Sequence, residues 1–227
     1  MPPSSPDASG TVPARLLPAL AWANVALHGV GLAVAWFGMR PGSVLVPLPQ
    51  RMAYLAASPP GWTWGWGIWM LCTLLLAAYM VALRLCLPGR SLEPRLALVF
   101  TAAGMAADLL TDAVQIQVLP LAARAGASGE TLFLAFERLA LTGGATVANG
   151  LYTSGILLMA IALHPLTGTP ARLAGGATVL AGTVMIFAGL LPSPELLALS
   201  TGPTIGFYSV WTLLVARDLG RRLERRA

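Results

Sequence analysis

The sequence predicts an all-α, polytopic membrane protein with six transmembrane helices, and three observations support that prediction. Of the 227 residues, 56% are hydrophobic and only 10% are charged, whereas an average soluble domain carries about 25% charged residues. The mean hydropathy is +0.73. The apolar residues also gather into runs that reach the roughly 20 residues a helix needs to cross a bilayer. These features exclude a soluble globule, a disordered chain and a coiled coil.

Short polar or proline-containing connections separate the runs. A Pro- and Ser-rich stretch, residues 1–15, is expected to be a disordered tail. The longest connection, roughly 40–61, is too short to bury a core of its own, so we expect one transmembrane domain over residues 16–216 and a basic cytoplasmic tail over 217–227. The expected spans are residues 16–39, 62–85, 96–121, 131–163, 173–191 and 196–215.

Tryptophans and glycines mark particular spans. Trp62, Trp64, Trp66 and Trp69 crowd the start of the second run, as is typical where a helix meets the lipid interface. The last two runs contain no interior charge, and small residues allow helices to approach closely in lipid. We therefore expect these runs to pack through their glycines, which are Gly175, Gly176, Gly182, Gly189, Gly202 and Gly206.

The arginines predict the orientation of the spans. All fourteen basic residues are arginine, a bias that, with the many Ala, Gly and Pro residues, is typical of a GC-rich bacterial gene and favours the inner membrane. Arginines concentrate on the cytoplasmic side of membrane proteins, so both termini are expected in the cytoplasm. That side then holds Arg15, Arg84, Arg90, Arg95, Arg172, Arg217, Arg221, Arg222, Arg225 and Arg226.

The outer side then holds only Arg40, Arg51 and Arg124, while Arg138 lies inside a span. The net charge of +5 is thus explained by membrane topology rather than by a nucleic-acid partner. The expected partners are the lipid bilayer and, at the basic C-terminus, anionic headgroups. A protein partner or a homo-oligomer is left open.

Polar side chains inside the third and fourth runs are the main functional signal, because ionisable groups are costly in lipid and rarely face it. Asp108 and Asp112 are four residues apart, and Gln115 continues the same helical face. The fourth run supplies the other side of a predicted polar ligand-binding or proton-linked site: Glu137, Arg138 and Asn149.

Two of these charges have matching depths. At 1.5 Å per residue, Asp112 and Arg138 lie roughly 13 and 10 Å from the outer ends of antiparallel spans, so we expect an ion pair between them. Asp108 then has no basic partner, and it must be protonated, share the arginine or face water. This assignment makes Asp108 the functional acid and Asp112 the structural one. The alternative for Asp108 is a neutral, structural acid that is hydrogen-bonded to Thr142 or Asn149.

The first run adds His28, near the midplane and four residues after Asn24. A lone membrane histidine is compatible with a helix-to-helix hydrogen bond or with a ligand contact, and we include His28 in the candidate site. The other histidine, His164, lies at a different depth at the end of the fourth run. Because the two cannot share a haem, we expect no cofactor, and we expect no metal site.

A short motif in the third run resembles a known enzyme signature. Gly104, Asp108 and Asp112 form GxxxDxxxD, which resembles the second half of the signature of CDP-alcohol phosphotransferases. These are six-helix lipid-synthesis enzymes, and the resemblance implies that the two aspartates bind a divalent metal. The first half of the signature needs two further aspartates and a glycine, where this chain has Leu87, Arg90 and Ser91.

A broader similarity covers most of the chain. The order of the runs, the Trp-rich start of the second run and the stretch NGLYTSGILLMAIALHPLTGTPARLAGGATVLAGTV are similar to a group of small bacterial six-helix integral membrane proteins of unknown function. This similarity implies an integral membrane protein, and it carries over no catalytic residues.

Three functions fit these patterns. The first is a small transporter or sensor that uses the polar site. The second is a non-catalytic accessory or assembly subunit, in which the polar groups only set helix register. The third is a lipid-modifying enzyme, for which the sequence lacks the upstream aspartates and any Ser-His or Cys-His arrangement, so no catalytic residue is assigned. A water-accessible cavity at Asp108 favours the first function, and dry packing favours the second.

Overall fold

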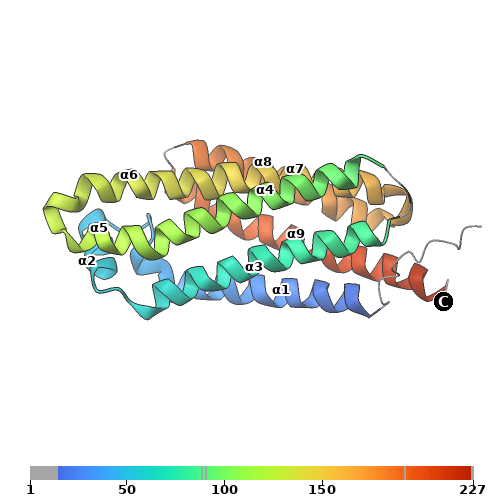
Figure 1. Cartoon of the computed structure of the whole chain (residues 1–227), viewed down its shortest axis with the longest axis horizontal. Helices are drawn as coiled ribbons and strands as arrows, with labels where there is room; N and C mark the ends of the chain where they lie inside the picture. The colour runs from blue at the N-terminus through green and yellow to red at the C-terminus, as the bar shows by residue number, and fades with distance from the viewer. Residues whose placement is uncertain (1–14, 88, 90, 192, 226–227) are drawn as a thin grey trace, which may run out of the picture.

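The computed structural model describes residues 15–87, 89, 91–191 and 193–225, and Figure 1 shows that they form an elongated bundle of helices. No strand occurs in this part of the chain, so the all-α prediction is confirmed. Nearly all of the expected N-terminal tail, together with Arg90 and Arg226 of the arginine pattern, lies outside the described residues.

Six rods of helix make up the bundle. The first joins α1 (Leu16–Val34), η1 (Ala35–Met39) and η2 (Arg40–Gly42), and the second is α3 (Pro60–Leu85). The third joins α4 (Glu93–Ala113), η3 (Val114–Val118) and α5 (Leu119–Arg124). After η4 (Gly126–Gly129), the fourth joins α6 (Glu130–Leu141), η5 (Thr142–Ala148), α7 (Asn149–Leu163) and η6 (His164–Leu166). The last two are α8 (Thr169–Leu190) and α9 (Pro194–Glu224).

Five of the rods are long and apolar enough to cross a membrane. They are the rods that begin at Leu16, Pro60, Glu93, Gly126 and Thr169, and they cover the first five predicted spans. The sixth rod, α9, covers the last predicted span but is less apolar than the other five, because Ser200, Thr201, Pro203 and Thr204 lie within that span. A multi-pass membrane protein is therefore supported, and the sixth crossing stays a prediction.

The start and end of α9 follow from local chemistry. Ser193 precedes the helix, and its hydroxyl accepts a hydrogen bond from the Leu196 N–H at 3.3 Å, while Pro194 occupies the first turn, where no N–H is needed. The helix continues beyond the predicted end of the span to Glu224. Arginine, leucine and glutamate are good helix formers, so the described part of the basic segment is helical.

The rods close into a ring that follows the order of the sequence. α1 packs against α3, α3 against α4, α4 against α7, α7 against α8 and α8 against α9, and α9 returns to α1. Successive rods are antiparallel because the connections between them are short. Figure 1 shows α2 and α5 at one end of the ring, here named the α2 end, and the C-terminus at the other, here named the C-terminal end.

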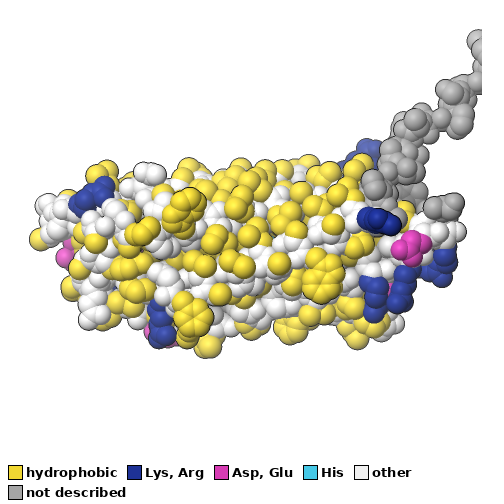
Figure 2. Space-filling view, turned by 90° about the horizontal axis from the view of Figure 1, so that it is seen from below, with side chains coloured by type: hydrophobic (Ala, Val, Ile, Leu, Met, Phe, Trp, Pro, Cys, Tyr) yellow, Lys and Arg dark blue, Asp and Glu magenta, His cyan; other side chains and the backbone are white. Residues whose placement is uncertain are grey.

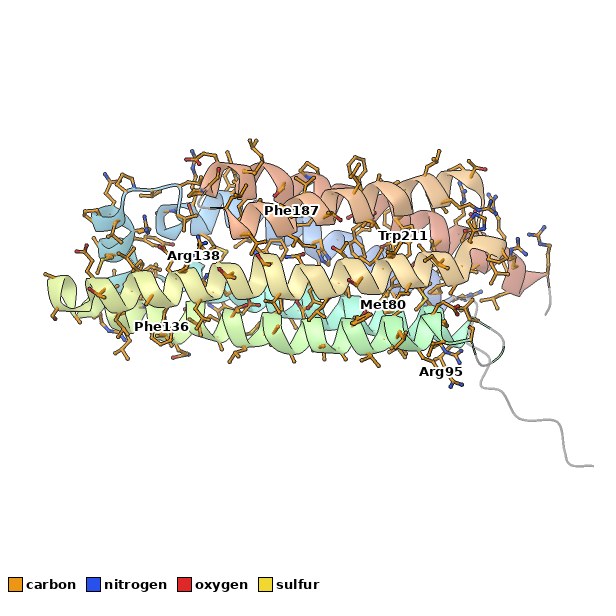
Figure 3. All side chains as sticks on the ribbon, turned by 90° about the horizontal axis from the view of Figure 1, so that it is seen from above. Met80, Arg95, Phe136, Arg138, Phe187 and Trp211 are labelled. Carbon is orange, nitrogen blue, oxygen red and sulfur yellow. The ribbon has the colours of Figure 1, made fainter. Side chains whose placement is uncertain are left out.

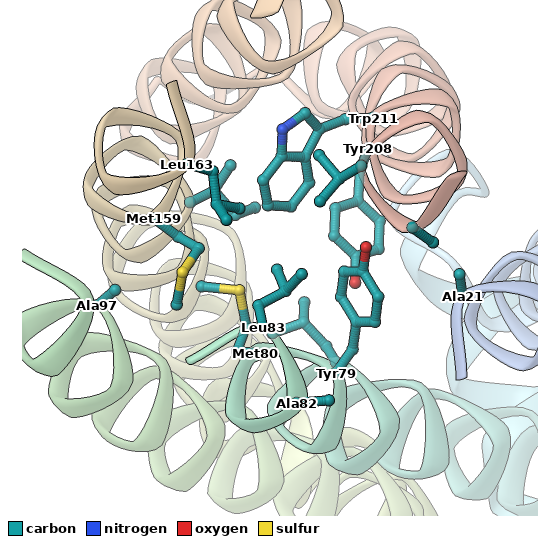
Figure 4. Packing of buried hydrophobic residues seen from close by; sticks show 14 of the residues in the cluster. Ala21, Tyr79, Met80, Ala82, Leu83, Ala97, Met159, Leu163, Tyr208 and Trp211 are labelled. Carbon is teal, nitrogen blue, oxygen red and sulfur yellow. The ribbon is translucent and has the colours of Figure 1, made fainter. Parts of the chain in front are cut away.

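Large side chains fill the axis of the ring toward its C-terminal end. Tyr79, Met80, Leu83, Met159 and Trp211 are each at most 1% exposed and belong to one hydrophobic cluster. Figure 4 shows these side chains pointing into the middle of the ring from opposite helices. A second, smaller cluster around Met39, Leu55, Trp62, Leu119 and Phe133 lies at the α2 end.

The outer surface has the distribution of apolar and charged side chains that is expected in a bilayer. Figure 2 shows hydrophobic side chains over the middle of one face and charged side chains gathered toward the two ends of the bundle. Large apolar side chains such as Trp22, Leu110, Leu173 and Leu180 are more than 60% exposed. An exposed apolar surface of this extent is unfavourable in water and favourable in contact with lipid.

A short helix in the first long connection was not predicted. This helix, α2 (Leu48–Ala56), packs against α5 and buries Met52 and Leu55 in the second cluster. The Tyr54 hydroxyl donates to the Gly38 carbonyl at 2.7 Å. The connection therefore folds back onto the end of the bundle, and it places Arg51 among buried groups.

Glycines allow close helix contact at some of the predicted positions and not at others. A Cβ at Gly182 on α8 would collide with Thr153 on α7, and one at Gly175 would lie 3.0 Å from the Trp211 ring. At Gly176, Gly202 and Gly206 nothing lies within 4 Å of such a Cβ. The expected packing role of the last three is therefore wrong for contacts among the described residues.

Replacing Gly182 by leucine should destabilise the bundle, since the new side chain must separate α7 from α8. Overpacking a close contact costs roughly 1–3 kcal/mol, which would lower the midpoint of thermal unfolding in detergent. Gly176→Leu is the matched control on the same helix, because that position faces open space. Equal midpoints for the two variants would contradict the packing described here.

Candidate functional site

A cavity of about 360 Å³ lies in the ring, bordered by residues of both hydrophobic clusters. All six rods contribute lining residues, and α8 contributes only Thr178 and Met185. Gly42, Ser43 and Val44 border it at the α2 end. The volume falls in the range, about 300–1,000 Å³, of pockets that hold small molecules.

Asp108, on α4, is held by hydroxyl groups from two neighbouring helices. Its Oδ2 accepts a hydrogen bond from the Thr73 hydroxyl on α3 at 2.6 Å and another from the Tyr152 hydroxyl on α7 at 3.2 Å. Its Oδ1 faces η5, where a Cβ at Gly144 would lie 3.8 Å away. These contacts give Asp108 a defined position between three rods.

Asp112, one turn further along α4, lines the same cavity and is only 2% exposed. Its Oδ2 is buried and has no hydrogen-bond partner among the described residues. A buried polar atom left unpaired typically costs about 1–3 kcal/mol. Such atoms are rare in folded proteins and mark sites where a ligand, an ion or water completes the bonding.

Glu137, on α6, also lines the cavity and is the acid that pairs with an arginine. Arg51 Nη2 donates to its Oε2 at 2.8 Å, and both side chains are about one-tenth exposed. Arg51 Nη1 donates to the Val46 carbonyl at 2.8 Å, and the guanidinium lies 6.0 Å from the centre of the Phe133 ring. The connection between the first two rods thus supplies the cation that neutralises Glu137.

The predicted ion pair between Asp112 and Arg138 is wrong. Arg138 is exposed, and its Nη2 donates to the Leu190 carbonyl at the end of α8 at 3.2 Å; Figure 3 places it toward the α2 end of the rod. Adjacent residues of a helix point about 100° apart, so Arg138 faces outward because Glu137 faces the cavity. The depth match was compatible with a pair, but the helical angle was not.

The contacts of the two aspartates differ from those expected. Asp108 was expected to lack a basic partner and Asp112 to be paired with Arg138. In the structure Asp108 accepts two hydroxyl groups, whereas Asp112 has no partner in the described part of the chain. Asp112 is therefore the stronger candidate for contact with a ligand.

His28 and Asn24 join α1 to two other helices. Asn24 Nδ2 donates to the Leu75 carbonyl at 2.8 Å, and the Tyr208 hydroxyl of α9 donates to Asn24 Oδ1 at 3.0 Å. His28 Nδ1 lies 2.9 Å from the Asn24 carbonyl, so Nδ1 carries the proton that is donated. In the neutral ring Nε2 is then an acceptor, and His28 lines the cavity against the Trp69 and Tyr208 rings.

Two π-helical segments position the remaining predicted residues. Gln115 lies in η3, and its carbonyl accepts a hydrogen bond from Trp62 Nε1 at 2.7 Å. Asn149 follows η5, and its amide donates to the Gly144 carbonyl at 3.0 Å. A π-helical turn leaves carbonyls without the usual partner four residues on, and such turns are frequent at functional sites.

The structure thus brings together six of the seven predicted site residues around one cavity, and Arg138 is the exception. Sequence reasoning missed Arg51, Thr73 and Tyr208 as members of the site. Hydroxyl groups facing an intramembrane acid are a usable signal for Thr73. No signal in the sequence marks Arg51, because its position depends on how the connection folds.

The described residues gather no group of three His, Cys, Asp or Glu side chains that could hold a metal ion. In the described part of the chain, no third carboxylate therefore lies beside Asp108 and Asp112 to complete the metal site that the phosphotransferase signature implies. No family model, no curated protein and no solved structure matches the chain.

Arg51→Gln should lower stability far more than Arg138→Gln. Removing the Arg51 guanidinium leaves Glu137 buried without its cation, and the loss of one member of a buried pair costs about 3–5 kcal/mol. Arg138 is the control, because its guanidinium is exposed. The readout is the thermal unfolding midpoint in detergent.

A second variant shows whether the loss belongs to the pair. Glu137→Gln introduced beside Arg51→Gln removes the uncompensated charge, so the double variant should recover part of the lost stability. Losses that simply add, or a larger loss for Arg138→Gln, would contradict the assignment of Arg51 as the partner of Glu137.

Proposed function

We propose that the chain is a six-span protein of the bacterial inner membrane that binds a small molecule in its cavity, as a transporter or a sensor. The observation that carries this proposal is Asp112, which lines the cavity and whose buried Oδ2 has no partner among the described residues. An intramembrane acid that no side chain satisfies is costly. A ligand that donates a hydrogen bond would satisfy it.

The cavity also bears on the choice between the first two functions. Side chains that only set helix register would be expected in dry, filled packing. Here Asp108, Asp112 and Glu137 surround a space of about 360 Å³, which favours ligand binding over a purely structural role. The hydroxyl groups of Thr73 and Tyr152 donate to Asp108 at the cavity, and these contacts position the acid for a binding protein as well as for an enzyme, so we assign no catalytic residue.

Proton transfer would accompany binding at Asp108 and Asp112. The other titratable groups that line the cavity are His28 on α1, Cys72 on α3, Glu137 on α6 with its partner Arg51, Tyr152 on α7 and Tyr208 on α9. α8 adds only Thr178 and Met185. The two aspartates are the acids among these without a basic partner, so they are the groups that would exchange a proton during ligand binding.

The proposed orientation has both termini in the cytoplasm, which places the α2 end outside. Reporters fused after Ser58, Leu87, Ala125, Leu166, Leu191 and Ala227 should be found outside, inside, outside, inside, outside and inside. Activity of a periplasmic reporter such as alkaline phosphatase gives the readout. A reporter found outside at both of the last two positions would mean that α9 does not cross and would overturn the six-span proposal.

Asp112→Asn is the variant that tests the function. The protein in lipid nanodiscs should retain a small molecule that mass spectrometry detects after denaturation, and Asp112→Asn should lose it. Difference infrared spectra from about pH 5 to 9 should show a carboxyl signal that the same variant lacks. Both changes follow from the loss of the cavity carboxyl that has no partner among the described residues.

Glu130→Gln is the matched control, since Glu130 is an exposed acid that does not line the cavity. It should leave both signals as in the unmodified protein. Equal retention by Asp112→Asn and Glu130→Gln would contradict the proposal and favour the accessory-subunit alternative. Counterflow of the retained molecule in proteoliposomes separates a transporter from a sensor, because only the former moves it.

A further inference from the structure

The charge around the cavity is entirely acidic. Asp108, Asp112 and Glu137 line it, and no arginine does so among the described residues; the chain contains no lysine. Arg51 neutralises Glu137, and that leaves two carboxyl groups for which the site offers no cation. Both carboxylates would repel an anionic ligand and attract a cation.

The bonding capacity of the two aspartates points to one of them. Asp108 Oδ2 already accepts two hydroxyl groups, at 2.6 and 3.2 Å. Asp112 Oδ2 accepts none from the described residues and is shielded from solvent. An ammonium group carries hydrogen-bond donors and no acceptor, so it supplies what Asp112 Oδ2 lacks.

The walls of the cavity suit a cation with an apolar body. The aromatic rings of Trp62, Trp66, Trp69, Tyr152 and Tyr208 border it, and a cation is attracted to the face of such rings. His28 presents an acceptor nitrogen when neutral, since its Nδ1 donates to the Asn24 carbonyl at 2.9 Å. None of these groups would repel an ammonium ion.

Aliphatic side chains complete the lining. Leu76 and Ile156, which belong to the hydrophobic cluster at the C-terminal end of the ring, border the cavity. Met185, Leu197 and Ile205 border it from α8 and α9. A strongly hydrated inorganic cation would gain nothing from these surfaces. An organic substituent would bury apolar area against them, at about 25 cal/mol per Å².

From these contacts we propose that the ligand is a small organic cation, an ammonium group on an apolar body, with the ammonium at Asp112 and the body between the aromatic rings. This inference rests on the proposed function, because it names the class of molecule that the same cavity binds. Exchange of the cation for a proton on the carboxyl group keeps the charge of the site balanced.

A native cysteine allows a direct test. Cys72 lines the cavity next to Thr73, and Cys86 is the only other cysteine of the chain. In a Cys86→Ser protein in nanodiscs, Cys72 can be modified by methanethiosulfonates of similar size and opposite charge. The trimethylammonium-ethyl reagent is the cation, and the sulfonatoethyl reagent is the anion. The rate of each reagent with Cys72 is divided by the rate of the same reagent with 2-mercaptoethanol.

The ratio of the two rates measures the charge preference of the cavity, since the fraction of reactive thiolate cancels. We expect the cationic reagent to react about tenfold faster, as an electrostatically focused site would require. Asp112→Asn in the same background should reduce the ratio several-fold. Glu130→Gln should leave it unchanged.

The outcomes separate the ligand class from the function itself. Equal rates, or a faster anionic reagent, would overturn the cation assignment while leaving an accessible cavity. No reaction with either reagent, in protein whose Cys72 reacts fully after unfolding in dodecyl sulfate, would show that small molecules do not reach the cavity. That result would overturn the proposed function as well.

Discussion

Six antiparallel helices can close into a ring only around an axial space, and the side chains that enter this space determine the rest of the structure. At the C-terminal end, Tyr79, Met80 and Trp211 pack into it. At the α2 end, Trp62 and the residues that α2 buries pack into it as well. Between the two clusters the axis is left to the cavity, and interiors of folded proteins rarely leave a space of this size unfilled.

The ion pair between Arg51 and Glu137 connects the ring to the segment that covers its end. Burying two charges gives little net stability, because the loss of hydration offsets most of their attraction. What the pair contributes is position, since Glu137 can be neutralised only while α2 stays packed against α5. The hydrogen bond from Arg51 to the Val46 carbonyl at 2.8 Å holds the same segment from its other side.

The sequence was sufficient for the features that depend on hydrophobicity and length. The five apolar rods and the sixth rod, α9, all lie at the predicted spans, because a run of about 20 apolar residues has few stable alternatives in a bilayer. The membership of the cavity was also largely predictable. Polar residues on a shared helical face, such as Asp108, Asp112 and Gln115, avoid lipid by facing the interior.

The pairing of those polar residues was not predictable, and the reason is angular. Depth along a helix follows from counting residues, but the direction of a side chain depends on every turn that precedes it. The π-helical segment Thr142–Ala148 lies between Arg138 and Asn149 and changes the angle between them, so an α-helical count that groups them on one face is misleading. The folding of α2, which brings Arg51 to Glu137, depends on tertiary contacts that no local pattern records.

The position of Asp112 along its rod has an electrical consequence. It lies twelve residues before Arg124, the last residue of α5, or roughly 18 Å from the α2 end at 1.5 Å per residue, within a hydrocarbon core of about 30 Å. In the proposed orientation, a cation that reaches it from outside has crossed a substantial part of the transmembrane field. Since a full crossing is worth about 2.3 kcal/mol per 100 mV, an inside-negative membrane potential would itself load the site.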